Sequence, residues 1–268
     1  MAVPVLKRFY LDPYMQIRSF VTHLTLNIVL IALAMQLPLH MTQFSAWQLL
    51  LVPLGIYLGG ISAVWIHNAT HSSFKNPIIN ELCGEIAGMH QLWGFLGWKI
   101  IHLMHHQYSD NSEMDPHPPK GKTFWQFAYS MFTGGSEKIS QRYRAHWGEN
   151  ARTNFLQKAT FAIFVTVAIT NAFLWYVVLG FYGFMLFFIP SYISNHLLFV
   201  DVNYTAHPED ADGNTKAANL NDTLYYKIAN FFWFGIYFHG NHHRRPMLFN
   251  PRHMPAKQAA EELEREAA

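Results

Sequence analysis

Eight histidines of this 268-residue chain fall in three tight clusters. The first is His67-Asn-Ala-Thr-His71. The other two share the pattern His-x-x-His-His and consist of His102, His105 and His106 and of His239, His242 and His243. Side chains three and four residues apart lie on one face of a helix, so the imidazoles of each cluster can converge. Imidazole nitrogens suit Fe, Zn, Cu or Ni rather than Mg or Ca, and the spacing therefore predicts a metal centre.

The composition narrows the class of protein that could carry such a centre. Hydrophobic residues make up 51% of the chain and charged residues 13%, whereas an average soluble domain has about 25% charged residues. The formal net charge is only +2 and no basic-aromatic pattern accompanies it, so we expect no nucleic-acid partner. The single cysteine, Cys83, excludes an internal disulfide and a cysteine-ligated zinc or iron–sulfur site.

Hydrophobic residues gather in four runs, each close to the roughly 20 residues that a transmembrane helix needs. The runs cover approximately residues 19–37, 46–66, 158–178 and 181–200. Short links join the first run to the second and the third to the fourth. The sequence therefore predicts an all-α integral membrane protein with four transmembrane helices arranged as two hairpins. A soluble all-α protein with very apolar core helices is the alternative, but no charged face accompanies these runs.

The positions of the lysines and arginines predict the orientation. All 19 lie outside the two short links, and basic residues favour the cytoplasmic side. We therefore expect both termini in the cytoplasm, together with a helical cap formed by residues 67–157 and 201–268. All three histidine clusters then reach the same cytoplasmic face. We find no internal repeat or second domain and treat residues 1–268 as a single domain.

A fourth element follows the last hydrophobic run, where an amide and an imidazole lie four residues apart in Asn203-Tyr-Thr-Ala-His207. A histidine alone at this place would be an ordinary structural residue. Because it lies on the face where the three clusters gather, we interpret His207 as a further metal ligand. Asn203 is expected to be an outer-sphere or water-bridged partner of the metal.

The motifs together resemble those of the membrane fatty-acid desaturase superfamily. His67-Asn-Ala-Thr-His71-Ser-Ser-Phe is similar to the first histidine box of that family. The stretch that begins at His102 and continues to Asp115-Pro-His117 resembles the second box with its downstream Asp-Pro-His. The third box is similar to His239-Gly-Asn-His242-His243, although the Gly-Asn pair inside it departs from the family pattern. Asn203–His207 looks like the Asn-x-x-x-His element of acyl-CoA desaturases.

The resemblance implies a membrane domain that holds two non-haem irons and uses O2 as co-substrate to desaturate a fatty-acyl chain. The acyl chain could be carried by a lipid, by coenzyme A or by an acyl carrier. The chain lacks a Gly-x-Gly-x-x-Gly dinucleotide motif. We therefore expect a separate electron donor, such as a ferredoxin or a cytochrome b5-type protein.

Two aspartates downstream of the second cluster are candidates for a supporting role. Asp110 and Asp115 lie close enough in sequence to accept the second N–H of a ligating imidazole. Loop or helix-capping roles explain them equally well. No catalytic residue beyond the metal ligands is apparent.

Other reactions share the same histidine architecture and stay open at this stage. They are O2-dependent lipid oxidations by hydroxylases, ketolases, alkane monooxygenases and alkene-forming decarboxylases. A zinc-dependent membrane hydrolase or a metal transporter is a more remote alternative. A transporter would hold its ligands near the middle of the bilayer, whereas these histidines are expected at the cytoplasmic ends of the spans.

Overall fold

The computed structural model describes residues 12–92, 94–109, 111, 113–210 and 215–255. In that part of the chain the regular structure is helical apart from two isolated β-bridges, so the predicted all-α fold is confirmed. The α-helices are α2 (Met15–Ala34), α3 (Leu51–Thr70), α4 (Pro77–Gly88), α5 (Phe95–Tyr108), α6 (Phe124–Trp147), α7 (Ala151–Gly183), α8 (Ile189–Thr205), α9 (Leu224–Phe232) and α10 (His239–Arg244). Three short turns of other helix types are η1 (Ala46–Leu50), η2 (Phe184–Phe188) and η3 (Pro251–His253).

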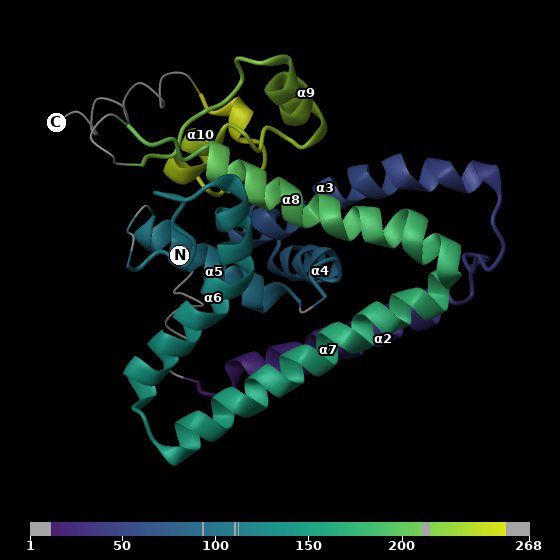
Figure 1. Cartoon of the computed structure of the whole chain (residues 1–268), viewed down its shortest axis with the longest axis horizontal. Helices are drawn as coiled ribbons and strands as arrows, with labels where there is room; N and C mark the ends of the chain where they lie inside the picture. The colour runs from purple at the N-terminus through teal and green to yellow at the C-terminus, as the bar shows by residue number, and fades with distance from the viewer. Residues whose placement is uncertain (1–11, 93, 110, 112, 211–214, 256–268) are drawn as a thin grey trace.

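Three helical stretches of the described chain are long and apolar enough to cross a membrane: Met15–Ala34, Ala46–Thr70 and Ala151–Thr205. The third is 55 residues long and contains both of the last two predicted runs. It is not straight, because Gly180 has a φ of 65° and a ψ of 178°. A Cβ atom at Gly180 would lie 2.7 Å from the carbonyl oxygen of Met41, so only glycine fits. Figure 1 shows the chain turning back near this point, with α7 and α8 on two different arms.

The long helices form a V in which each arm holds two helices from distant parts of the chain (Figure 1). One arm pairs α2 with α7, and the other pairs α3 with α8. The first hairpin was predicted from its short link, and the structure shows that its two helices diverge. Each of them packs instead against a helix of the second hairpin. The link defines which helices are consecutive, but side-chain packing decides which helices are neighbours.

Different side chains join the two helices of each arm. In the α3–α8 arm, a side chain at Gly55 or Gly59 would overlap the backbone of Phe187 or Ser191, so the two glycines allow close helix contact. In the α2–α7 arm, Asn27 Nδ2 donates to Asn171 Oδ1 over 2.5 Å, and both residues are fully buried. An amide pair of this kind satisfies polar groups that have no access to water.

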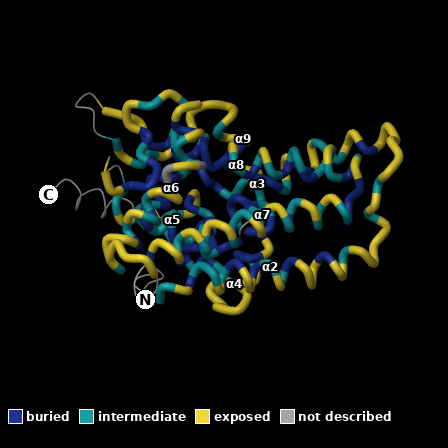
Figure 2. Tube along the Cα trace, turned by 60° about the horizontal axis from the view of Figure 1, so that its bottom comes forward, coloured by how far each residue is buried: buried dark blue, intermediate teal, exposed yellow. Residues whose placement is uncertain are grey.

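The remaining helices gather between and beyond the open ends of the two arms (Figure 1). Figure 2 shows buried residues concentrated in this region, whereas the far ends of the long helices are mainly exposed. The largest apolar core includes Ile66 of α3, Phe95 of α5, Phe199 of α8 and Tyr237, which lies two residues before α10. This core holds together the helices that carry the histidine clusters.

Candidate metal centre

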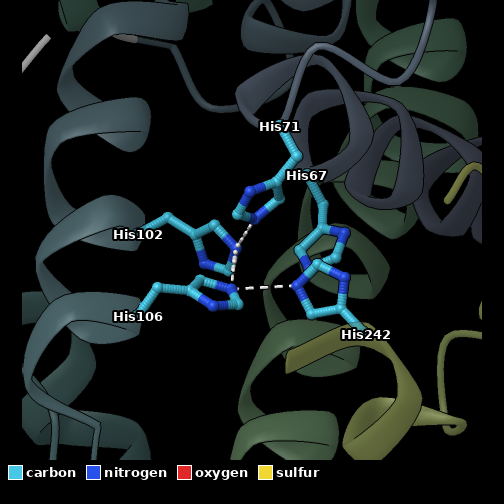
Figure 3. A group of neighbouring side chains, drawn as sticks. All are labelled: His67, His71, His102, His106 and His242. Carbon is cyan, nitrogen blue, oxygen red and sulfur yellow. Dashed lines mark hydrogen bonds between the residues drawn. The ribbon is translucent and has the colours of Figure 1, made fainter. Parts of the chain in front are cut away.

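Five imidazoles from three parts of the chain meet near the open end of the α3–α8 arm (Figure 3). Their candidate ligand atoms all lie within 4.8 Å of one another. The members of this five-histidine site are His67 on the last turn of α3, His71 directly after α3, His102 and His106 on α5, and His242 on α10.

The Nε2 atoms of this site face one another at short distances. They are 2.9 Å apart between His71 and His102, 3.1 Å between His102 and His106, and 2.9 Å between His106 and His242. Two nitrogens bound at right angles to one ion at about 2.1 Å would be about 3.0 Å apart. The Nε2 atom of His67 is buried and has no hydrogen-bond partner among the described residues. The donor set and its spacing therefore fit a metal ion.

A second group of imidazoles lies beside the first. The members of this four-histidine site are His105 on α5, His207 just after α8, and His239 and His243 on α10, again with ligand atoms within 4.8 Å. His239 Nε2 is 3.2 Å from His207 Nε2 and 3.1 Å from His243 Nε2. The two sites are adjacent, because the rings of His106 and His243 stack with their centroids 4.4 Å apart. The structure thus brings all nine histidines named from the sequence into two neighbouring groups.

The two His-x-x-His-His motifs are each shared between the two sites in the same way. The i and i+4 members of a motif always serve the same site: His102 and His106 do so in one, and His239 and His243 in the other. The i+3 member of each His-x-x-His-His set, His105 or His242, turns to the opposite site. Residues three and four apart lie on either side of one helix face. Two facing helices with this motif can therefore build two adjacent metal positions.

Asp115 lies behind the four-histidine site. Its Oδ2 atom is 2.9 Å from His105 Nδ1, and both side chains are essentially inaccessible to solvent. Asp115 Oδ1 accepts the backbone N–H of His117 over 2.9 Å. A carboxylate that accepts the Nδ1–H of an imidazole leaves the lone pair on Nε2 for a metal. Asp110, the other aspartate considered, lies outside the described residues.

His117 takes part in the surroundings of His105. Its ring is buried, and its centroid is 4.6 Å from that of His105. With His105 and Asp115 it forms a further group of side chains that could hold a metal ion, and its Nδ1 atom lies 3.8 Å from Asp115 Oδ1. We interpret His117 as a packing partner of His105.

Asn203 is placed on the last turn of α8, four residues before His207. Its side chain is buried, and Nδ2 donates to the carbonyl oxygen of Phe199 over 2.8 Å. The Oδ1 atom has no hydrogen-bond partner among the described residues. An outer-sphere role for this oxygen stays a prediction.

The Gly-Asn pair inside the third motif has a structural reason that sequence reasoning missed. Gly240 packs against the backbone of Ala217, so a side chain there would crowd that segment. Asn241 exchanges two hydrogen bonds with Asn219, of 2.8 and 2.9 Å, and donates to the carbonyl oxygen of Pro251. These contacts hold α10 in place. Asn219 is 22 residues away in sequence and in no motif, so no local signal could have identified it.

The electrostatic environment keeps the imidazoles neutral. Burial lowers the pKa of His102, His106, His239 and His242 well below the ordinary value of 6.5, and nearby histidines lower it further. Only a neutral imidazole has a lone pair to offer a metal. The site is therefore prepared for metal binding at neutral pH without the loss of a proton.

Two adjacent all-histidine groups at the end of long apolar helices define the class of the protein as a histidine-rich metalloprotein with membrane-length helices. The family model described as fatty acid desaturase matches residues 45–267, and the chain belongs to this family. No curated protein and no solved structure matched the chain in the same comparisons. The buried histidine groups are typical of the di-iron site of that family.

Proposed function

We propose that the protein is an O2-dependent di-iron enzyme that removes two hydrogens from an unactivated fatty-acyl chain. The observation that supports this most directly is the pair of adjacent, buried, all-histidine groups in a chain of the desaturase family. Desaturation takes two hydrogens from the acyl chain, and O2 is reduced to two waters with two further electrons and two protons. The extra electrons would come from a separate donor of the ferredoxin or cytochrome b5 type.

The five-histidine site and the four-histidine site would each hold one iron. Bound iron would supply the oxidising power from O2 that an acyl C–H bond requires, because no acid–base pair can activate such a bond. Soluble di-iron proteins of the four-helix type use Glu and Glu-x-x-His ligands. Here imidazoles provide every candidate ligand of both sites. With metal bound, this set of neutral ligands would leave the centre with a higher positive charge than a carboxylate-rich one.

The protein's own residues position these ligands and exclude water. Asp115 would hold His105 in the tautomer that is protonated at Nδ1 and has its lone pair on Nε2, and Asn241 anchors the helix that carries three of the histidines. Most of the nine imidazoles are buried; His106 and His243 are only partly covered. A dry site of this kind protects a reactive centre from side reactions.

We infer that the chain crosses the membrane four times, with both histidine sites on the cytoplasmic side. The 55-residue apolar stretch bends back at Gly180, which supports two crossings in place of one. Cysteine labelling tests this with Thr42→Cys and Phe181→Cys, both at exposed positions. Gly180→Cys is unsuitable because of its positive φ. Both cysteines should react only from the non-cytoplasmic side, and labelling of Thr42→Cys from the cytoplasm would contradict the proposed topology.

Lipid analysis of a host that expresses the protein tests the reaction. New double bonds should appear in acyl chains with the wild-type chain and be absent with His105→Ala, which removes one ligand of the four-histidine site. Hydroxylated, ketone or chain-shortened products would instead assign another O2-dependent oxidation of the same superfamily. Metal analysis of the purified protein should find close to two irons per chain. Stoichiometric zinc without iron would contradict the proposal.

A further inference from the structure

Helix α5 carries His102, His105 and His106, so its placement determines the geometry of both metal sites. It begins at Phe95, after Gly94 in the N-cap position. Glycine has no side chain to accept the first free N–H groups of the helix, and Gly94 provides no capping hydrogen bond. Both Gly94 and Phe95 are buried, so water is a poor substitute. The start of this helix therefore needs an acceptor from elsewhere in the protein.

Glu85 of α4 provides that acceptor. Its Oε2 atom lies 3.5 Å from the backbone nitrogen of Phe95 and 2.7 Å from Nδ1 of His23 on α2. Glu85 is 7% exposed and His23 is fully buried. One carboxylate on α4 thus contacts both the N-terminus of α5 and a side chain of α2. A negative charge is also favourable at the positive end of the α5 dipole.

The surrounding packing requires this arrangement. A side chain at Gly84 would overlap the ring of Phe95, and one at Gly88 would overlap the backbone of Gly94. Gly94 itself has a φ of 91° and lies directly against the His23 ring. Three glycines therefore allow α4, the start of α5 and His23 to approach closely. Such contacts are what bring the Glu85 carboxylate within reach of the helix end.

The orientation of Phe95 is transmitted along α5 to the histidines. Phe95, Trp98, His102 and His105 follow one another at intervals of three, four and three residues, which places them on one face of the helix. Trp98 stacks on the His102 ring, with centroids 5.5 Å apart and planes 15° from parallel. A shift or rotation at Phe95 would therefore displace the imidazoles. Both metal sites depend on this helix.

We propose that Glu85, held by His23, is a positioning residue for the metal centre because it caps the N-terminus of α5. This inference rests on the proposed function in so far as the two histidine sites bind metal. Loss of the cap lowers the fraction of molecules in which the α5 histidines are correctly placed. The apparent metal affinity falls by the same fraction.

The test uses full-length protein in detergent, stripped of metal and titrated with Co²⁺, whose absorption spectrum reports ligand geometry. Glu85→Leu should weaken Co²⁺ binding about tenfold, as expected for loss of a helix cap. Glu85→Gln keeps an oxygen that can accept the Phe95 N–H, and should retain nearly the wild-type affinity and spectrum. Glu81→Gln is the matched control, because Glu81 lies on the exposed face of the same helix, where it contacts α5 through a 3.8 Å surface ion pair with Lys99, and such exposed pairs contribute little. It should behave as wild type.

Hydrogen exchange of the metal-free proteins gives a second readout that does not depend on metal. Amides in the first turn of α5 should exchange faster in Glu85→Leu and stay protected in Glu85→Gln and Glu81→Gln. If Glu85→Leu does not accumulate, Glu85→Asp replaces it, because its carboxylate is one methylene too short to reach Phe95. Glu85→Asp should then show the weaker Co²⁺ binding and the faster exchange in the first turn of α5.

The outcomes separate this inference from the proposed function. A wild-type protein that binds no Co²⁺ contradicts the proposed metal centre. Wild-type binding of two Co²⁺ with unchanged affinity and exchange in Glu85→Leu overturns the capping role alone. Weak binding in Glu85→Gln also overturns it, because that variant keeps the acceptor.

Discussion

The five-histidine and four-histidine sites share a ligand chemistry but differ in how the chain supports them. The first is built entirely from the three histidine motifs, and none of its imidazoles hydrogen-bonds a carboxylate in the described part of the chain. The second recruits His207 from outside those motifs and has Asp115 behind His105. The two metal positions are therefore unequal in the number of imidazoles and in nearby negative charge. The proposed O2-dependent activity would need a metal with an open position, and we expect that position at the site with fewer imidazoles.

The largest effects should come from removing one ligand of each site. His242→Ala deletes one imidazole of the five-histidine site, and His239→Ala deletes one of the four-histidine site. We expect each variant to lose about one of the two metals, since a bound ion needs most of its ligands, and to form no detectable product. Metal analysis and lipid analysis check both statements. Full activity in either variant would remove that histidine from the ligand set.

His207, the one ligand candidate outside the three motifs, tests whether the four-histidine group is a metal site. His207→Ala should lower bound metal and abolish turnover, because it leaves three imidazoles in the smaller site. Asn203→Ala should retain most of the metal and slow the reaction, because its Oδ1 atom is at most an outer-sphere partner. The readouts are metal content and rate of product formation. If His207→Ala keeps all its metal and activity, the smaller site is not a metal site as described.

Asp115 is expected to have an intermediate effect, confined to the four-histidine site. Asp115→Leu removes the acceptor for His105 Nδ1–H and should weaken metal binding at that site by about 10- to 100-fold. Asp115→Asn keeps an acceptor oxygen but not the charge, so its loss should be smaller. Glu113→Gln, at an exposed position two residues away, is the control. Equal weakening at both sites would show that the aspartate acts on the fold as a whole.

Both sites contain buried histidines with a lowered pKa, and a pH series tests this shared property. We expect its effect on stability to be the smallest of the predicted effects. Burial holds the pKa of His102 and His242 in one site, and of His239 in the other, below 6.5 in the folded protein. Below about pH 6.5 the unfolded chain therefore binds more protons than the folded one, and stability falls as the pH falls. Above that pH these groups contribute no pH dependence. Thermal unfolding of the metal-free protein at about pH 7.5 and about pH 5.5 measures the difference. A midpoint that does not decrease would contradict the neutral, buried state of these rings.

Much of the site was predictable because its information is local. Histidines spaced by three and four residues share a helix face whatever the helix packs against. His207 could be identified because the spacing Asn203-x-x-x-His207 occurs just beyond a hydrophobic run, and the structure brings it to the others. The apolar runs likewise predicted the long helices, although the first begins at Met15, the second continues to Thr70, the third begins seven residues early at Ala151 and α8 begins eight residues late at Ile189.

Other features depend on residues far apart in the chain. The sequence could not show that α2 packs on α7, since the short link to α3 suggested a tight hairpin. The sequence named two aspartates, Asp110 and Asp115, as possible hydrogen-bond acceptors for a ligating histidine. The contact between Asp115 and His105 became visible only in the structure. The hydrogen bonds between Asn219 and Asn241 and the contact of Glu85 with Phe95 had no signal in any motif.

The sequence by itself determined the ligand chemistry, the helical class and the membrane-length spans, because composition and helical period are properties of neighbouring residues. The tertiary structure alone decided that the nine imidazoles divide into groups of five and four. That division depends on how α5 and α10 are rotated toward each other and toward the ends of α3 and α8. The rotation is set by packing and hydrogen bonds between distant side chains, which no local pattern encodes.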